Sequence, residues 1–224
     1  MKREIGAAMD LARRLRALRP QKLALGVLLT VIFCAGYFAI EYHPLRPSVR
    51  LRPTLIDQAV PFLPRWVLVY QSLYVLLAAG WLAETGDQLR RYTTGFFILM
   101  AVGFTCFLLW PVAGPRPQEI ITADPLYRLV VRYDTPLNSF PSLHMALATY
   151  SACVAVAVTP ARRRLLTILL AAWVALIGYA TLATKQHYAV DLPPGILLGW
   201  LAQKIAWRGD GGDARREERI SPLS

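Results

Sequence analysis

Six apolar runs recur along this chain of 224 residues and constrain its fold more than any other feature. Five contain no acidic or basic side chain, and the sixth is interrupted only by Asp191. A helix needs about 20 residues to cross the hydrocarbon core of a bilayer, and most of the runs approach or exceed this length. We therefore predict an all-α, polytopic membrane protein with six transmembrane helices, at residues 23–40, 66–83, 92–114, 145–161, 165–184 and 188–202.

The composition agrees with a single membrane-embedded unit. Hydrophobic residues make up 55% of the chain and its mean hydropathy is +0.39, which is too apolar for an ordinary soluble domain. We predict a transmembrane catalytic domain at residues 23–206, with outer loops at about 41–64 and 115–142. A basic amphipathic segment at 1–22 precedes it on the cytoplasmic side, and a disordered cytoplasmic tail follows at 207–224.

The basic residues set the predicted orientation. The chain has 25 Lys and Arg against 14 Asp and Glu, a net charge of +11. With six spans, 17 of the 25 fall on the side that holds both termini, so the positive-inside rule places the termini in the cytoplasm. No groove of interleaved aromatic and basic residues accompanies this charge, which argues against nucleic acid as a partner.

The two long outer loops differ in character. Five prolines between residues 41 and 64 predict an irregular, rigid connector rather than a helix. In the second loop, Asp124-Pro125 is a helix-start signal followed by apolar residues at helical spacing. Arg128 and Arg132 lie one turn apart on this helix, which is a candidate lid over the site. The alternative is an interfacial helix that only covers the bundle.

Two histidines should meet at the outer face. His144 and His187 are 43 residues apart, which fits one crossing out and one back. Asp191 needs a partner, because an unpaired carboxylate in an apolar span is costly. On a helix, His187 and Asp191 would share a face, so that Nδ1 donates to the carboxylate and Nε2 keeps a lone pair. Pro193-Pro194 leaves the alternative that the two meet across a turn.

Cationic and helix-start groups reach the same face. Ser142 is a natural N-cap that places His144 in a first helical turn, where free amides attract an anion. Arg116 and Lys185 add positive charge, and a guanidinium suits bidentate contact with phosphate oxygens. We therefore predict a phosphate site with His144, His187 and Asp191 as catalytic residues, and Arg116, Lys185 and Ser142 as phosphate-binding residues.

Three motifs carry a family resemblance. Pro141-Ser142-Leu143-His144 matches Pro-Ser-x-His, and His187 to Asp191 matches the end of Ser-Arg-x5-His-x3-Asp. Arg116-Pro117 matches the end of Lys-x6-Arg-Pro. On these residues the chain resembles the type 2 phosphatidic acid phosphatase superfamily. The resemblance covers roughly residues 57–201.

The chain departs from the family pattern at two places. Leu109 stands where the first motif has lysine, and Ala180-Thr181 stands where the third has Ser-Arg, so Lys185 is the candidate replacement for one missing cation. The chain looks more like the inositolphosphotransferase-like branch, which includes inositol phosphorylceramide synthases. This likeness rests on the sequences of residues 110–116 and 184–188, together with Asp57 and residues 61–64.

The resemblance implies an enzyme that cleaves a lipid phosphate ester or anhydride at the extracytoplasmic face. His187 would attack phosphorus and form a phosphohistidine, Asp191 would orient it, and His144 would protonate the leaving oxygen. No metal or other cofactor is implied. Water as the second substrate gives a phosphatase, whereas a lipid acceptor gives a phosphotransferase, and the sequence leaves both open.

Three other readings compete with this one. His144, His187 and Asp191 could instead hold a metal, although the neighbouring cations would repel it. Ser142 could be a hydrolase nucleophile, but no Gly-x-Ser-x-Gly elbow surrounds it. A non-enzymatic lipid carrier, with Asp191 and Lys185 as a structural pair, is the third.

Overall fold

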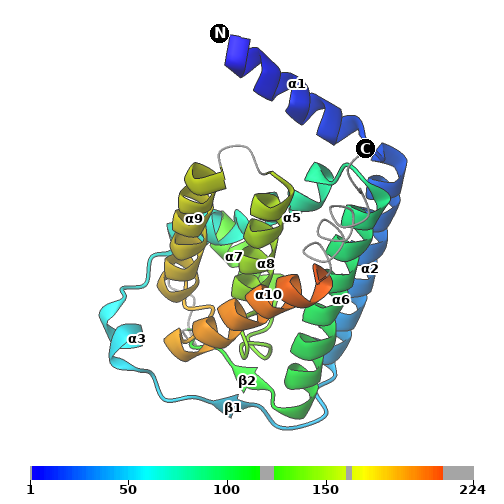
Figure 1. Cartoon of the computed structure of the whole chain (residues 1–224). Coiled ribbons are helices and arrows are strands. Elements are labelled where there is room, and N and C mark those ends of the chain that lie inside the picture. Colours follow the sequence, from blue (N-terminus) through cyan, green and yellow to red (C-terminus); the bar gives the residue numbers. More distant parts are fainter. Residues whose placement is uncertain (1, 117–123, 160–162, 209–224) are drawn as a thin grey trace.

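Helices account for most of the chain in the computed structural model, which describes residues 2–116, 124–159 and 163–208 (Figure 1). The predicted predominance of helix is confirmed, and a single pair of two-residue strands accompanies the helices in these ranges. The elements, in chain order, are α1 (Lys2–Arg16), α2 (Arg19–Tyr42), β1 (Val49–Arg50), α3 (Leu55–Ala59), η1 (Pro64–Trp66), α4 (Val67–Gln71), α5 (Leu73–Leu77), η2 (Ala78–Leu82), α6 (Gly86–Leu109), β2 (Val112–Ala113), α7 (Pro125–Tyr133), α8 (Leu143–Val158), α9 (Arg163–Ala183), η3 (Ala189–Asp191) and α10 (Leu192–Ala206).

Four helical segments of the described chain are long and apolar enough to cross a membrane. They are Arg19–Tyr42, Pro64–Leu82, Gly86–Leu109 and Arg163–Ala183, and they match four of the six expected spans. The remaining two expected spans form α8 and α10, which are only 16 and 15 residues long. At 1.5 Å per residue each reaches about 24 Å or less, short of a full hydrocarbon core.

Helix α8 is the centre of the bundle. Eleven of its 16 residues are buried, and α5, α6, α9 and α10 surround it. Helix α10 crosses it closely (Figure 1), because Gly195 and Gly199 lie one turn apart on the facing side. A Cβ at either glycine would collide with the backbone carbonyl of Ser142 or Ala146. This small-residue pair brings the start of α10 against the start of α8.

The second apolar run is broken rather than continuous. It consists of η1, α4, α5 and η2 in succession, with Ser72 between the two α-helices. The Ser72 hydroxyl donates to the carbonyl of Val69 at 2.6 Å and accepts from Trp173 Nε1 at 2.8 Å. The break therefore has side-chain hydrogen bonds that stabilise it, and it leaves Tyr70 and Gln71 at the last turn of α4.

Loops and strands cover the end of the bundle opposite α1 (Figure 1). Strand β2 pairs in parallel with β1, and its Val112 carbonyl also accepts from the Ser139 amide at 3.0 Å. The connector expected between residues 41 and 64 is largely irregular, but it contains the short helix α3, which a capping box of Thr54 and Asp57 starts. The expected helix after Asp124 is present as α7, with the Asp124 carboxylate accepting from the Tyr127 amide at 2.9 Å.

Helix α1 projects from the other end of the bundle (Figure 1). Leu18, at a positive φ of 55°, makes the turn into α2. The buried Lys22 ammonium holds the junction by donating to the carbonyls of Arg14 and Trp81, each at 2.7 Å. A helix therefore occupies much of the expected amphipathic segment 1–22, whereas residues 209–224 of the expected tail lie outside the described part.

Candidate active site

A cavity of about 390 Å³ contains both histidines of the two motifs. Arg116 and Gln186 also line its polar end. Its other end is apolar and runs along α2 and α5 under α7, where the lining includes Phe33, Phe38, Leu73, Leu77, Leu126 and Leu129. Cys34 and Tyr74 line the cavity and are also exposed on the bundle surface, so the cavity reaches that surface between α2 and α5.

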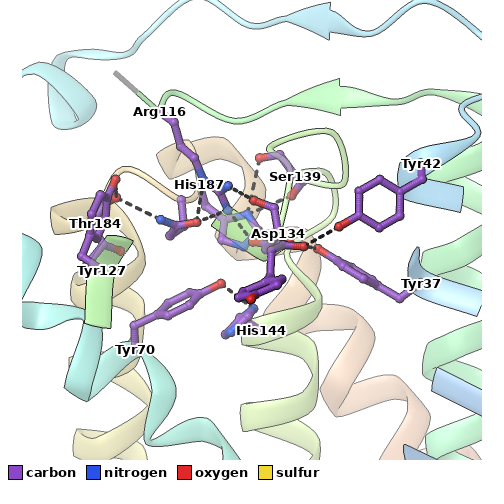
Figure 2. Close-up of polar contacts among 12 residues, drawn as sticks. Tyr37, Tyr42, Tyr70, Arg116, Tyr127, Asp134, Ser139, His144, Thr184 and His187 are labelled. Atoms are coloured by element: carbon purple, nitrogen blue, oxygen red, sulfur yellow. Dashed lines mark hydrogen bonds and ion pairs between the residues drawn. The ribbon is translucent and has the colours of Figure 1, made fainter. Parts of the chain in front are cut away.

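His187 is buried at the polar end and held through one ring nitrogen. Its Nδ1 lies 3.0 Å from the carbonyl oxygen of Ser139 (Figure 2). A carbonyl oxygen only accepts, so this contact requires a proton on Nδ1 and leaves the lone pair of a neutral ring on Nε2. The tautomer expected from the sequence therefore follows from the geometry, but the main partner is a backbone carbonyl.

Asp191 lies behind His187 and is fully buried. Its Oδ2 accepts from the Ser139 hydroxyl at 2.5 Å and from the Tyr188 amide at 2.8 Å, and it is 3.5 Å from His187 Nδ1. The two motif residues meet across a turn, because η3 ends at Asp191 and α10 begins one residue later. The prediction that His187 and Asp191 share one face of a helix is therefore wrong, and the alternative that they meet across a turn is confirmed.

His144 faces His187 from the first turn of α8. The two ring centroids are 6.1 Å apart, a separation that accommodates one phosphoryl group between them. The His144 ring stacks on Tyr70 with centroids 3.9 Å apart, and its Nδ1 lies 3.1 Å from the Tyr70 hydroxyl. Its Nε2 is buried and has no hydrogen-bond partner among the described residues. This nitrogen is available to a ligand in the cavity.

Arg116 is fixed at the cavity wall by two neighbours. Its Nε donates to Gln186 Oε1 at 2.8 Å, and its terminal nitrogens contact Gln186 Oε1 and both the carbonyl and the carboxylate of Asp134 (Figure 2). The other Asp134 carboxylate oxygen accepts from Tyr37 of α2 at 2.8 Å. Gln186 and Asp134 therefore preorganise the guanidinium, Tyr37 in turn holds Asp134, and the Arg116 side chain is only 7% exposed.

Two of the residues predicted to bind phosphate, Lys185 and Ser142, are not in the described lining of the cavity. The Lys185 ammonium donates to the carbonyls of Asp57 at 2.8 Å and Val60 at 2.6 Å, and the residue is absent from the described cavity lining. Burial lowers the pKa of this ammonium, and the Asp57 carboxylate partly opposes that shift. Ser142 is fully buried, with its hydroxyl accepting from the Met145 amide at 3.3 Å, so it caps α8 as expected without lining the cavity.

The α7 helix contributes its apolar face to the cavity. Leu126, Leu129 and Val130 line it, whereas Arg128 and Arg132 are exposed and are not part of the described lining. Tyr127 ties α7 to the loop of His187, because its hydroxyl donates to the carbonyl of Thr184 at 3.1 Å. The helix therefore covers the cavity through hydrocarbon contacts, and its two arginines point elsewhere.

Sequence reasoning missed four residues that shape the site: Tyr70, Asp134, Ser139 and Gln186. Each acts on a predicted residue through a hydrogen bond. Gln186 had a sequence signal, because it lies between Lys185 and His187, two of the predicted site residues. The positions of Tyr70, Asp134 and Ser139 depend on how the broken second span and the outer loops fold, and the periodicity of apolar residues does not predict those folds.

This arrangement defines a class of helical membrane protein in which two imidazoles and a guanidinium share a partly apolar cavity. The chain matches the model of the PAP2 superfamily over residues 58–205, about two thirds of its length, and it belongs to that superfamily. The match supports a phosphatase or phosphotransferase type of function in a membrane. No curated protein and no solved structure matches the chain.

Proposed function

We propose that this protein cleaves a lipid phosphate ester or anhydride through a phosphohistidine at His187. The observation that carries the proposal is the Nδ1 contact of His187 with the Ser139 carbonyl, which leaves Nε2 as a nucleophile. The His144 ring faces it, with the two ring centroids 6.1 Å apart, and Arg116 lines the same end of the cavity.

The chemistry proceeds in two steps. His187 Nε2 attacks phosphorus while the bond from phosphorus to the leaving oxygen breaks, and imidazolium His144 gives its proton to that oxygen. Arg116 stabilises the charge on the equatorial oxygens. Neutral His144 then takes a proton from the second substrate, whose oxygen attacks phosphorus and breaks the bond to nitrogen. Asp191 holds Ser139, and so the carbonyl that orients His187.

Phosphate contact by Lys185 and Ser142 is not part of this proposal. Their hydrogen bonds assign Lys185 to the support of the catalytic loop and Ser142 to the start of α8. Burial of Ser142 also argues against a serine nucleophile. A metal held by His144, His187 and Asp191 is disfavoured because Asp191 lies behind His187, away from the described lining of the cavity.

We further propose six spans, with α8 and α10 as short crossings, both termini in the cytoplasm and the site at the extracytoplasmic face of a plasma or inner membrane. The distribution of basic residues supports this orientation. Reporters fused at residues 162–164 should stay cytoplasmic. If the reporter lay on the extracytoplasmic side instead, the site would face the cytoplasm and the proposed orientation would be wrong.

The alternative outcome is transfer of the phosphoryl-linked group to a lipid acceptor, as in the inositol phosphorylceramide type of synthase. Purified protein incubated with labelled lipid phosphates, with and without ceramide or diacylglycerol, separates the two, because hydrolysis releases free phosphate and transfer makes a new lipid. His144→Ala and His187→Ala should lose activity, whereas His43→Ala, at the exposed end of α2, is the matched control. Full activity of either site variant on every lipid that the parent cleaves would refute the assignment.

A further inference from the structure

Two amide side chains line the cavity with buried polar atoms that lack a partner. Gln71 Oε1 and Asn138 Nδ2 have no hydrogen-bond partner among the described residues. Gln71 follows Tyr70, which stacks on His144, and Asn138 precedes Ser139, whose carbonyl holds His187. The two amides line the same cavity as the two histidines, one from the broken second span and one from the outer loop.

These atoms are expensive to leave unsatisfied. Each buried amide without a partner loses a substantial part of its stabilisation in water, and the loss is larger at membrane depth. Gln71 lies in the segment Pro64–Leu82, one of the four candidate spans, where a polar side chain normally faces a functional cavity. Asn138 is only 7% exposed, so bulk solvent does not supply its partner. The missing hydrogen bonds must therefore come from whatever fills the cavity, either ordered water or a bound ligand that displaces it.

The phosphoryl group does not meet this demand by itself. A phosphate oxygen can accept from Asn138 Nδ2, but an ionised phosphate has no proton to donate to Gln71 Oε1. Because the unsatisfied atoms are one acceptor and one donor, the group that suits both is neutral and can donate as well as accept. Hydroxyls and secondary amides have this property, whereas a plain hydrocarbon chain does not.

We infer that Gln71 and Asn138 form a subsite for a hydroxyl or amide carried next to the phosphate of the lipid substrate. This inference rests on the proposed function and names its substrate class. Monoacylglycerol phosphates carry a hydroxyl there and sphingoid-based lipid phosphates carry a hydroxyl and an amide or amine, while isoprenoid and simple alkyl phosphates carry neither. The apolar part of the cavity, between α2 and α5, takes the hydrocarbon chain of either kind.

The test compares matched lipids that differ in the backbone next to the phosphate. Hexadecyl phosphate has neither group, 1-palmitoyl glycerol 3-phosphate has a hydroxyl, and ceramide 1-phosphate has an amide and a hydroxyl. We expect the kcat/KM of the parent to be about tenfold higher for the second than for the first, the effect of one or two hydrogen bonds. Gln71→Met, similar in length but without the amide, should reduce this ratio to about twofold or less.

Controls separate the subsite from folding and from catalysis. Gln58→Met changes an exposed glutamine on α3 outside the described cavity lining, so it should keep the parent ratio. Asn138→Ala is the second variant, in case Gln71→Met does not fold. A parent ratio near one, or a ratio that both amide variants preserve, would overturn the subsite.

Binding to the His187→Ala protein gives a readout that does not need turnover. Tighter binding of the hydroxylated lipid than of hexadecyl phosphate, lost in the double variant with Gln71→Met, supports the subsite even if the parent cleaves neither lipid. That outcome would refute the proposed function alone. Equal affinities for the two lipids would overturn the subsite and leave the proposed chemistry untouched.

Discussion

Replacing Lys185 by methionine tests whether this residue supports the loop that carries His187 or binds phosphate. The segment between residues 54 and 63 is joined to the His187 loop by four contacts. The Leu63 amide donates to the Ala183 carbonyl at 2.8 Å, and the Ala189 amide donates to Asp57 Oδ1 at 2.7 Å. The other two are the Lys185 ammonium bonds to the carbonyls of Asp57 and Val60.

The magnitude follows from these bonds. A hydrogen bond from a charged donor contributes about 1.5–3 kcal/mol. Two of them would give at least ~3 kcal/mol, and partial exposure of Lys185 lets water replace some of it, so we expect a loss of about 2 kcal/mol in unfolding free energy. For a protein of this size that corresponds to a Tm lower by about 4–8 °C. A shift of His187 by a fraction of an ångström should lower kcat by about tenfold or more.

The assay measures Tm, kcat and inhibition by inorganic phosphate in purified Lys185→Met protein. A supporting role predicts lower Tm and kcat with nearly unchanged inhibition by phosphate, since the ammonium does not reach the cavity. Lys204→Met removes an exposed lysine from the last turn of α10 and is the matched control. An unchanged Tm together with much weaker inhibition by phosphate would refute the reasoning and return Lys185 to the phosphate site.

Two further substitutions probe the geometry. Gly195→Val would place side-chain atoms against the Ser142 carbonyl, so α10 should separate from α8, and both Tm and activity should fall. Gly86 has open space around it, so Gly86→Ala should change neither. A fully active Gly195→Val protein would contradict the close contact between the two helices. Tyr70→Phe keeps the aromatic ring stacked on His144 but removes the hydroxyl that lies 3.1 Å from His144 Nδ1. The kcat should fall about three- to tenfold at constant KM. A change confined to KM would argue that Tyr70 binds substrate instead.

The sequence predicted which residues come together better than it predicted what they touch. Apolar run lengths and the spacing of the histidines suffice to bring His144 and His187 to one place, because helices of fixed rise return the chain to the same side. The same reasoning did not indicate the partners of Lys185, the carbonyls of Asp57 and Val60. Its positive φ of 55° turns the chain just before His187, and its side chain reaches the Asp57 loop. The spacing of residues along the sequence does not predict this backbone conformation at Lys185.

The partners of the histidines were beyond sequence reasoning for a related reason. Ser139 reaches His187 and Asp191 only because its segment hydrogen-bonds to Val112. Tyr70 reaches His144 from the last turn of α4, and nothing in the apolar run announces the break at Ser72. The two glycines of α10 were a readable signal for close packing on α8, since small residues four apart recur where membrane helices touch.

The central claim is that His187 Nε2 becomes covalently phosphorylated, and its most direct test is to trap that bond. Parent, His187→Ala and His43→Ala proteins are mixed with lipid phosphate labelled on phosphorus, quenched in alkali within milliseconds and mapped by mass spectrometry. The account predicts label on His187 in the parent and the His43→Ala protein, and none in His187→Ala. Turnover in the parent with label on another residue, or a labelled and active His187→Ala protein, would contradict it.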